Sequence, residues 1–401
     1  MLATSIEKRL FSQRAYNIRD DSGKLNISKD LISFSLGMPD GEHMPSEAIG
    51  KAVARALQRH GSWPLQYGSP VGFEGLLDAL VEKLYKGQGI ECQRDNLLLT
   101  SGGSQALGLL CELFLDPGDV VLTEIPTYAW AIRTFKCLGA QIEGIPIDED
   151  GLQVQALEQK LADLSRRRIT PKLLYIIPNF HNPTGLTTTL QRRRRIIELA
   201  QRYQFMILED DAYYDLRFAG EQLPTLYELA GGQNIFYMGT FSKILSAGLR
   251  LGWIVGSPTA INHLALLKVD GCTSPFAAYT AYEYYQSGAL DGRIQQLIGL
   301  YRHRCNILLS ELAATMPEDI HWTVPAGGFY TWLTLPERND ALRMLPLARR
   351  AGIDYLPGTA CFHDGSGQQH IRLAYSYVPE ADMITGIQRL AQVIQQDASR
   401  Q

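Results

Sequence analysis

The chain has no long hydrophobic run, and this absence excludes a class of protein. No window of about 18 uncharged apolar residues, the length that spans a bilayer, occurs in its 401 residues. Charged residues at positions 7–9 interrupt the N-terminal segment before an apolar core of signal-peptide length has formed. We therefore expect no membrane contact and a cytoplasmic location.

The sequence also has no excess of basic residues. Its formal net charge of -4 predicts no basic surface for the phosphates of a nucleic acid, so we expect no nucleic-acid partner. A run of four arginines, residues 192–195, opens a stretch of helical periodicity. We interpret this run as the solvated face of a helix rather than as a binding patch.

Cysteine is sparse and shows no paired spacing. The six cysteines stand at positions 92, 111, 137, 272, 305 and 361. They have neither the spacing of a zinc site nor the density of a disulfide scaffold. We expect reduced thiols and no metal site.

Seven short apolar runs alternate with longer stretches of helical periodicity through the middle of the chain. The runs lie at 96–100, 120–124, 140–147, 172–178, 205–210, 234–240 and 250–256. The alternation predicts an α/β lobe with a mostly parallel, seven-stranded sheet that helices cover on both faces. Too few residues separate the last two runs for a crossover helix, so we expect one antiparallel strand there.

The pattern changes from about residue 290. A long amphipathic helix is followed by short strands and two further helices, which predicts a smaller α+β lobe. We expect the loop-like segment before about residue 45 to pack against this lobe or to reach a partner subunit. The predicted parts are an N-terminal arm that joins the small domain, a large domain and a small C-terminal domain, at 1–45, 46–288 and 289–401.

Two loops after predicted strands carry residues that can bind a ligand. In "TSGGSQALGLLCELFL" (100–115), two glycines permit a tight backbone path, and Ser104 stands at the expected N-cap of an apolar helix. Free N–H groups at such a helix start form a phosphate cradle, although the same residues also suit a plain turn. In "PNFHNPTG" (178–185), Asn182 stands where open α/β sheets bind ligands, and the alternative is a loop rich in turn formers.

A third loop, "ILEDDAYYDL" (207–216), ends an apolar strand in three acids. Acids at a strand end are often solvated. A buried carboxylate there needs a cationic partner, because an unpaired one costs too much free energy. A protonated ring nitrogen would be such a partner.

Lys243 is the last residue of the stretch "NIFYMGTFSK" (234–243), and Arg250 stands seven positions further on. A lone lysine is ordinarily solvated. Together with the groups described above, Lys243 can bind one kind of ligand. Its amine can condense with an aldehyde, a carboxylate can keep a pyridine nitrogen protonated, and amides, hydroxyls and an arginine can hold a phosphate. Together these groups describe one ligand, pyridoxal phosphate.

The order of the motifs resembles that of the fold type I, class I and II aminotransferases, particularly the branch of 2-aminoadipate, kynurenine and aromatic aminotransferases. The resemblance extends from about residue 33 to 395. It rests on "SLGMPD", "LQYGSPVGFEGLLDAL", "TSGGSQAL", "PTYAW", "PNFHNPTG", "EDDAYYDL", "TFSK", "GLRLGW", "PAGGFY" and "IRLAYS".

The resemblance implies three catalytic residues. Lys243 would form the Schiff base with the cofactor and shuttle a proton between the substrate Cα and the cofactor C4′. Asp210 would pair with the pyridine nitrogen as the first acid of the family's Asp-x-x-Tyr spacing. Asp211 is its rival, because only the register of the strand separates the two. Tyr213 would hydrogen-bond the ring hydroxyl together with Asn182.

The resemblance also implies a set of binding residues. Arg372 would take the substrate α-carboxylate in a bidentate pair, with Asn182 and the Gly37 backbone lining the substrate pocket. Tyr128 would stack on the cofactor ring. Tyr67 would reach the phosphate of the neighbouring subunit's cofactor, which implies a homodimer with shared active sites. The phosphate would be held by Gly103, Ser104, Gln105, Thr240, Ser242 and Arg250.

The implied reaction moves the α-amino group of an aromatic, long aliphatic or dicarboxylic amino acid to a 2-oxo acid, with 2-oxoglutarate as the expected acceptor, in a ping-pong sequence. Lyases, oxidases and cyclases of natural-product pathways use the same residues and are the alternatives. A ligand-sensing regulator would need roughly 70 further N-terminal residues for a DNA-binding module. The motifs begin at about residue 33, so we expect an enzyme instead.

Overall fold

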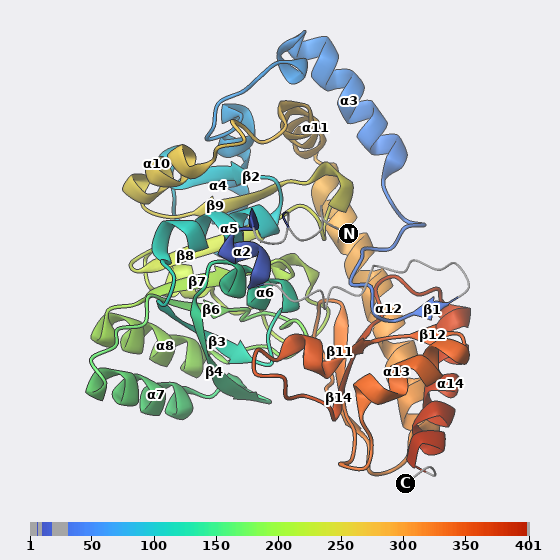
Figure 1. Cartoon of the computed structure of the whole chain (residues 1–401). Coiled ribbons are helices and arrows are strands. Elements are labelled where there is room, and N and C mark those ends of the chain that lie inside the picture. The colour runs from blue at the N-terminus through green and yellow to red at the C-terminus, as the bar shows by residue number, and fades with distance from the viewer. Residues whose placement is uncertain (1–5, 7–9, 18–30, 399–401) are drawn as a thin grey trace.

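A computed structural model describes residue 6, residues 10–17 and residues 31–398 of the chain. In this part of the chain the strands form three sheets, of eight, four and two strands. The eight-stranded sheet and its helices make up one lobe, and the smaller sheets lie beside it with the C-terminal helices (Figure 1). Among these residues, no helix combines the length and the apolar character that a membrane span requires.

The large sheet confirms the predicted α/β architecture. Its strand order is β2-β9-β8-β7-β6-β3-β4-β5. The strands are β2 (Leu97–Thr100), β3 (Val120–Ile125), β4 (Gln141–Asp148), β5 (Gly151–Leu152), β6 (Leu173–Ile176), β7 (Met206–Asp210), β8 (Ile235–Thr240) and β9 (Gly252–Val255). The seven predicted runs all form strands, and the two-residue β5 is added at one edge. Five strands run parallel from β8 to β4, whereas β9 pairs antiparallel with both β8 and β2, as predicted.

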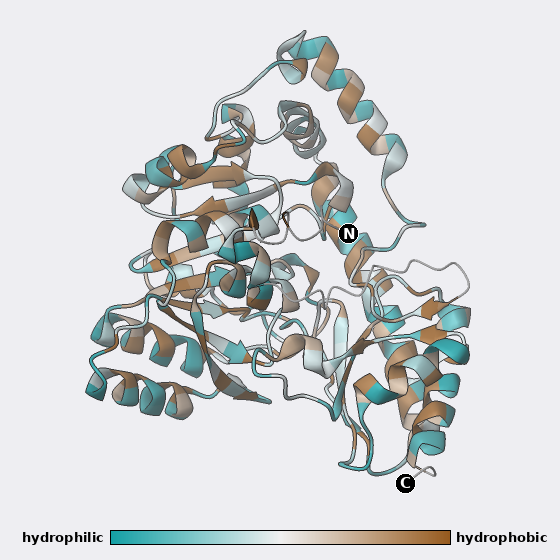
Figure 2. Ribbon diagram, viewed as in Figure 1, coloured by the Kyte–Doolittle hydropathy of each residue, from teal (hydrophilic) through white to brown (hydrophobic). Residues whose placement is uncertain are grey.

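Helices cover both faces of this sheet, because alternate residues of its strands enter two hydrophobic clusters. Leu173 and Tyr175 of β6 belong to one cluster, and Leu174 and Ile176 belong to the other. The first face is covered by α5 (Gly103–Phe114), α6 (Ala129–Cys137) and α10 (Pro258–Leu267). The second is covered by α4 (Glu74–Gln88), α7 (Val154–Arg166), α8 (Leu190–Tyr203) and α11 (Pro275–Gln286). Figure 2 shows the hydrophobic strands between helices that carry both hydrophilic and hydrophobic residues.

The arginine run at the start of α8 differs from its prediction as a solvated face. Arg194 is exposed, but Arg193 is completely buried. The guanidinium of Arg193 donates to the carbonyl oxygens of Thr188, Pro224 and Pro178. Helical periodicity turns this side chain toward the sheet with the apolar residues of α8, and the four consecutive arginines concealed that turn.

The smaller lobe contains a four-stranded antiparallel sheet in the order β10-β11-β14-β13. Its strands are β10 (His321–Trp322), β11 (Tyr330–Thr334), β13 (Leu356–Pro357) and β14 (His370–Ala374). Its helices are α12 (Ala289–Thr315), α13 (Ala341–Arg350) and α14 (Glu380–Ala398). The long α12 connects the two lobes (Figure 1).

Residues 32–34 pack against the smaller lobe, whereas α2 (Gln13–Tyr16) contacts α6 of the large lobe. Strand β1 (Ile32–Ser33) pairs parallel with β12 (Ile353–Asp354), and the Ala374 N–H donates to the Phe34 carbonyl oxygen. The remaining elements are α3 (Ser46–His60), α9 (Leu226–Leu229) and five single-turn 3₁₀ helices: η1 (Trp63–Leu65), η2 (Arg94–Asn96), η3 (Tyr214–Leu216), η4 (Ala247–Leu249) and η5 (Gly358–Cys361). The domain boundaries at residues 46 and 289 stay a prediction.

Candidate active site

The predicted site residues gather where three neighbouring parallel strands end. Strand β7 lies between β6 and β8 in the sheet, and all three point the same way. Their carboxyl ends therefore start three loops at one edge, which carry Asn182, Tyr213 and Lys243. This edge is where open α/β sheets bind ligands.

Lys243 lies in the loop after β8, with its amine turned into the protein. Its Nζ donates to the Gly37 carbonyl oxygen at 3.0 Å and lies 5.3 Å from the centre of the Phe329 ring. Withdrawal from water and the positive charges of Arg372 and Arg250 together lower the pKa of this amine to about 8, while the charge of Asp210 acts in the opposite direction. About a tenth of the amine is therefore uncharged at pH 7, and this form can act as a nucleophile.

The two adjacent acids at the end of β7 have different surroundings. The Tyr175 hydroxyl donates to Asp210 Oδ2 at 2.6 Å. Burial raises the pKa of Asp210, whereas the bond from Tyr175 and the charge of Lys243 lower it. Asp211 accepts from Asn179 Nδ2 at 2.8 Å instead. Burial and the charge of the buried Glu209 raise the pKa of Asp211 well above its usual value. Asp210 is thus the acid on the Lys243 side of the strand.

The predicted phosphate cradle lies at the start of α5. The helix begins at Gly103, and Gly102 is its N-cap. The prediction that Ser104 is the N-cap was therefore wrong, because Ser104 is the second residue of the helix. Gly102 has a φ of +82°, and a Cβ there would lie 2.7 Å from a guanidinium nitrogen of Arg250. The loop therefore needs glycine for its backbone conformation, and a side chain there would displace the guanidinium of Arg250. The first N–H groups of α5 have no acceptor within the helix and favour an anion.

The ends of β2, β8 and β9 bring the other predicted phosphate ligands to this helix start. Gly252 pairs with both Thr100 and Thr240, and a Cβ on Gly252 would lie 2.8 Å from the Gly102 carbonyl carbon. Thr240 Oγ1 and Ser242 Oγ are hydrogen-bonded at 2.9 Å. The predicted hydroxyls, helix start and Arg250 are therefore neighbours.

Gln105 differs from the other predicted phosphate ligands, because its side chain already has partners. Its Oε1 accepts from the Ser101 N–H at 2.6 Å, and its Nε2 donates to Asp270 Oδ2 at 2.7 Å. Its backbone N–H is bonded to the Gly102 carbonyl oxygen within the helix turn. In this arrangement Gln105 fixes the loop before α5.

Arg372 of β14 comes from the smaller lobe and faces the loop after β6. Its guanidinium donates to Asn182 Oδ1 at 2.9 Å and to the Ser35 carbonyl oxygen at 2.6 Å. It also lies over the Tyr330 ring, 4.3 Å from the ring centre. Arg372 and Asn182 are therefore in direct contact. Gly37 lies beside them, because the Tyr330 hydroxyl is 1.9 Å from the position that a Cβ on Gly37 would take.

The two remaining predicted tyrosines differ in burial: one lies near the site and the other lies on the surface. Tyr128 is partly buried at the start of α6, where burial raises its pKa and the charges of Asp210, Arg372 and Arg250 act on its hydroxyl. Tyr67 is 91% exposed. A single chain therefore brings Tyr128 to the site and leaves Tyr67 on the surface.

Two tyrosines that sequence reasoning did not assign contact the predicted residues directly. Tyr175 lies within the apolar run of β6, where its hydroxyl binds Asp210. Tyr330, the last residue of "PAGGFY", is 2% exposed, and its hydroxyl lies 3.0 Å from the Tyr213 hydroxyl. A tyrosine inside the otherwise apolar strand β6 is a signal for Tyr175, because a buried hydroxyl needs a polar partner. Tyr330 stands at the start of the buried strand β11, where the same need applies.

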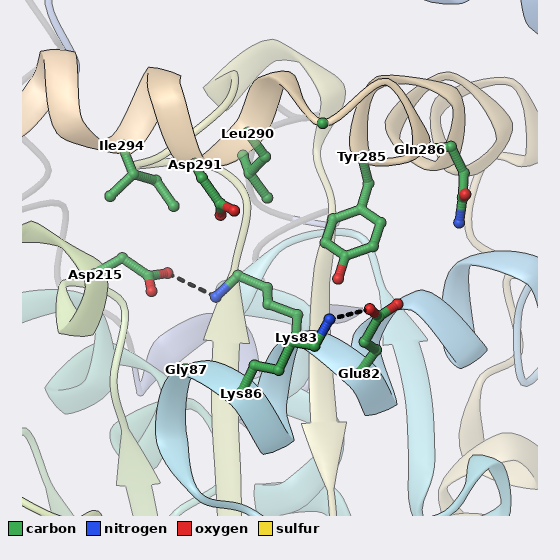
Figure 3. Close-up of a pocket in the computed structure, with 11 residues that line it drawn as sticks. Glu82, Lys83, Lys86, Gly87, Asp215, Tyr285, Gln286, Leu290, Asp291 and Ile294 are labelled. Atoms are coloured by element: carbon green, nitrogen blue, oxygen red, sulfur yellow. Dashed lines mark hydrogen bonds and ion pairs between the residues drawn. The ribbon is translucent and has the colours of Figure 1, made fainter.

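A second pocket, between helices of the large lobe and the start of α12, has different chemistry. It has a volume of about 480 Å³ and is lined by residues of α4, η3, α11 and α12, with none of the predicted site residues among them. Figure 3 shows that Lys83 is paired with Asp215 and Lys86 with Glu82. The two ammonium groups that line this pocket are thus already paired with carboxylates of the protein.

The charges around Lys243 are not neutralised in this way. Among the described residues, no Asp or Glu forms an ion pair with Lys243, Arg250 or Arg372. These cations and the single nearby carboxylate of Asp210 leave an excess of positive charge. That excess fits a ligand with a phosphate and a substrate with a carboxylate. No three His, Cys, Asp or Glu side chains in the same part of the chain gather as a metal site. Fold and site together define a fold type I pyridoxal phosphate enzyme.

Comparisons with known proteins identify the family. The family model described as "Aminotransferase class I and II" matches residues 29–390. The chain is 37% identical to Aromatic-amino-acid aminotransferase 1 of Thermococcus litoralis, over 98% of this chain and 96% of that protein. The chain therefore belongs to the class I and II aminotransferases. It is an amino-group-transferring enzyme with pyridoxal phosphate as its cofactor.

Two solved structures have the same fold. The multiple substrate aminotransferase from Thermococcus profundus superposes with a TM-score of 0.94 at 35% identity and covers 98% of this chain and 100% of its own. The kynurenine aminotransferase of Pyrococcus horikoshii, solved in complex with PMP, KYN and KYA, gives a TM-score of 0.93 at 36% identity, over 97% and 98% of the two chains. The resemblance expected from the sequence is confirmed.

Proposed function

We propose that Lys243 is the residue that carries the cofactor and moves the proton in the transfer of an α-amino group to a 2-oxo acid. The observation that carries this proposal is the buried amine of Lys243, whose pKa is lowered to about 8 by burial and by two arginines that no carboxylate neutralises. Bound pyridoxal phosphate supplies a ring that accepts the electrons released at the substrate Cα. Lys243 Nζ, once free and uncharged, would take the proton from the substrate Cα and deliver it to the cofactor C4′.

We assign the other residues by their surroundings. Arg372 binds the substrate carboxylate, because its planar guanidinium matches two carboxylate oxygens, and Asn182 and Ser35 hold its orientation. Asp210 holds a negative charge beside the ring nitrogen, and the Tyr175 hydroxyl orients it. Tyr213 donates to the ring oxygen, and Tyr128 covers the ring. The phosphate is held by Gly103, Ser104, Thr240, Ser242 and Arg250.

Aromatic, long aliphatic and dicarboxylic amino acids are the proposed substrates, with 2-oxoglutarate as the acceptor. Support comes from the substrates in the names of the relatives and from the aromatic walls that Tyr128, Tyr213 and Phe329 provide. The six cysteines are all free, which suits the reducing cytoplasm.

A panel of amino acids of these three types, each with and without 2-oxoglutarate, tests the reaction. We expect one equivalent of oxo acid per site without the acceptor and continuous turnover with it, because a ping-pong enzyme must return the amine before its next cycle. A lyase would release ammonia continuously without the acceptor, and an oxidase would consume oxygen. Either outcome would contradict the proposal.

We also infer a homodimer in which Tyr67 enters the partner's site. Trp63, Leu65 and Tyr67 form an exposed patch in and beside η1, with 66, 68 and 91% of their surfaces accessible. Such a patch of large apolar residues marks an interaction surface. A second copy of the chain would cover it and bring the Tyr67 hydroxyl to a phosphate.

Mixed dimers of two inactive variants test this arrangement. Lys243→Ala removes the amine of its own site, and Tyr67→Ala removes the hydroxyl that a chain gives to its partner. A dimer with one chain of each kind contains one complete site, so we expect mixing and refolding to restore up to half of the activity per dimer. Activity that stays at the level of the separate variants would contradict the shared site.

A further inference from the structure

Tyr330 connects parts of the site that come from distant segments of the chain. Its hydroxyl lies 3.0 Å from the hydroxyl of Tyr213, 117 positions earlier. The face of its ring lies under the Arg372 guanidinium, 4.3 Å from the ring centre. Its hydroxyl also fills the space beside Gly37, whose carbonyl oxygen accepts from Lys243. One side chain thus contacts residues proposed to bind the cofactor ring and the substrate carboxylate.

The position of Tyr330 is fixed by its surroundings. It is the first residue of β11, which pairs with β14, so that Tyr330 stands opposite Ala374 and Trp332 stands opposite Arg372. Tyr330 and Arg372 are therefore diagonal neighbours on adjacent strands, a distance that an aromatic ring spans. With 2% of its surface exposed, Tyr330 has little freedom to turn away.

The two hydroxyls restrict the direction of their hydrogen bond. A phenol hydroxyl has one proton to donate and can accept two hydrogen bonds. Burial, and the neighbouring Tyr330, raise the pKa of Tyr213 well above its usual value, so Tyr213 keeps its proton. If Tyr213 gives that proton to an oxygen of the ligand, then Tyr330 must be the donor between the two tyrosines. In such a chain each bond polarises the next, which makes Tyr213 a stronger donor.

We propose that Tyr330 is a positioning residue with two separable parts: its hydroxyl orients the Tyr213 proton toward the ring oxygen of the cofactor, and its ring supports Arg372 for binding of the substrate carboxylate. This inference rests on the proposed roles of Tyr213 and Arg372. The hydroxyl acts on the cofactor through Tyr213, whereas the ring acts on the substrate through Arg372.

Two variants of Tyr330 separate these parts. Tyr330→Phe keeps the ring and removes the hydroxyl. Tyr213 then becomes a weaker donor to the ring oxygen, and the pH midpoint of the absorbance change of the cofactor-loaded protein should move upward by about half a unit, a threefold effect typical of one neutral hydrogen bond. The KM for the amino acid should stay within about twofold, because the contact with Arg372 is retained.

Tyr330→Leu removes the ring as well. Arg372 then loses the aromatic face beneath it, and the KM for the amino acid should rise by about 3- to 30-fold, the range of a cation–π contact. The upward shift of the absorbance midpoint should match that of Tyr330→Phe. Tyr355→Phe is the matched control, because Tyr355 is a buried tyrosine whose hydroxyl binds the Ala341 carbonyl oxygen away from the site. We expect the control to change neither quantity.

Tyr213→Phe and the double variant Tyr213→Phe/Tyr330→Phe complete the test. If the Tyr330 hydroxyl works through Tyr213, the double variant has the same midpoint as Tyr213→Phe alone. Two outcomes would overturn the role of the hydroxyl. In the first, the midpoint shifts of the two single variants add up in the double variant. In the second, Tyr213→Phe shifts the midpoint and Tyr330→Phe does not. A wild-type protein that gains no absorbance band with pyridoxal phosphate would instead overturn the proposed function itself.

Discussion

Two lysines of this chain have similar pKa values and very different surroundings. Burial lowers the pKa of Lys268 to about 8, as it does for Lys243. The Lys268 amine donates to three acceptors, the carbonyl oxygens of Pro70 and Leu99 and the hydroxyl of Thr273, at 3.0, 3.0 and 2.6 Å. The Lys243 amine donates to one, the Gly37 carbonyl oxygen. Lys268 ties three backbone segments together, whereas Lys243, when uncharged, keeps one N–H and a lone pair for a ligand.

The comparison shows that a lowered pKa alone does not identify a reactive amine. An ammonium group has three protons, and Lys268 uses all of them within the protein. The positive charges of Arg372 and Arg250, which lower the pKa of Lys243, have no equivalent around Lys268, where Asp270 and Cys272 act to raise the pKa. Open hydrogen-bonding capacity and uncompensated positive charge therefore distinguish the proposed catalytic lysine.

The largest expected effect is that of replacing Lys243. Lys243→Ala should lower the transamination rate by on the order of 10⁴-fold, the upper range for loss of a general base, and should remove the absorbance band of the covalently bound cofactor. Steady-state kinetics and an absorbance spectrum measure both effects.

Lys268→Met is the matched comparison for this prediction. It should keep the rate within a few-fold, and it should lower the free energy of unfolding by about 1–3 kcal/mol, because it removes the three hydrogen bonds that the Lys268 amine donates. Denaturant unfolding measures that loss. A catalytic defect in Lys268→Met as large as that of Lys243→Ala would remove the distinction between the two lysines.

A smaller effect is expected at Asp210, the last residue of β7, and at Asp211, which follows it. Asp210→Asn removes the negative charge on the Lys243 side of the strand and should lower the turnover rate by on the order of 10²–10³-fold, as loss of one preorganised electrostatic contact does. Asp211→Asn changes a carboxylate that binds Asn179 and should affect mainly stability. Single-turnover rates with one amino acid compare the two variants. Equal rates in both would show that the register does not select Asp210.

The smallest effect concerns the pH dependence of cofactor attachment. The uncharged amine is the nucleophile, so the rate at which the apoprotein bonds to added pyridoxal phosphate should rise with pH and level off above about 8, where Lys243 has lost its proton. Arg372→Gln removes a positive charge that lowers this pKa, and the midpoint should move upward by less than about one unit. Stopped-flow absorbance measures these rates.

A second arginine provides the control for this pH shift. Arg349 is paired with Asp354 in the smaller lobe, and Arg349→Gln should leave the midpoint unchanged. A midpoint that moves downward in Arg372→Gln would show that the charge of Arg372 does not act on Lys243.

Most of the large sheet could be predicted, because its strands are continuous apolar runs that are buried on both faces. The start of α5 was misplaced, because the sequence does not show which residue of the loop takes the positive φ that Gly102 has at the N-cap. The burial of Arg193 was missed for a similar reason: its four acceptors come from loops after β6 and before α9 and α8, which the sequence does not place.

At the site, residue types were more predictable than their contacts. The motifs indicated Lys243 and an acid, but they left Asp210 and Asp211 open, because adjacent residues at a strand end differ only in the side they face. The hydroxyl of Tyr175, on the neighbouring strand and 35 positions away, marks the side of Asp210. The contact of Tyr330 with Tyr213 depends on how the smaller lobe packs against the large sheet, which no local pattern indicates.

Chemical trapping of the cofactor on the wild-type protein tests the central claim most directly. Borohydride reduction of the loaded enzyme fixes the cofactor to the amine that binds it, and mass spectrometry of the digested protein locates the modified residue. We expect the label on the peptide that contains Lys243 and none on the peptide that contains Lys268. A label on Lys268 or another lysine, with Lys243 unmodified, would contradict the account.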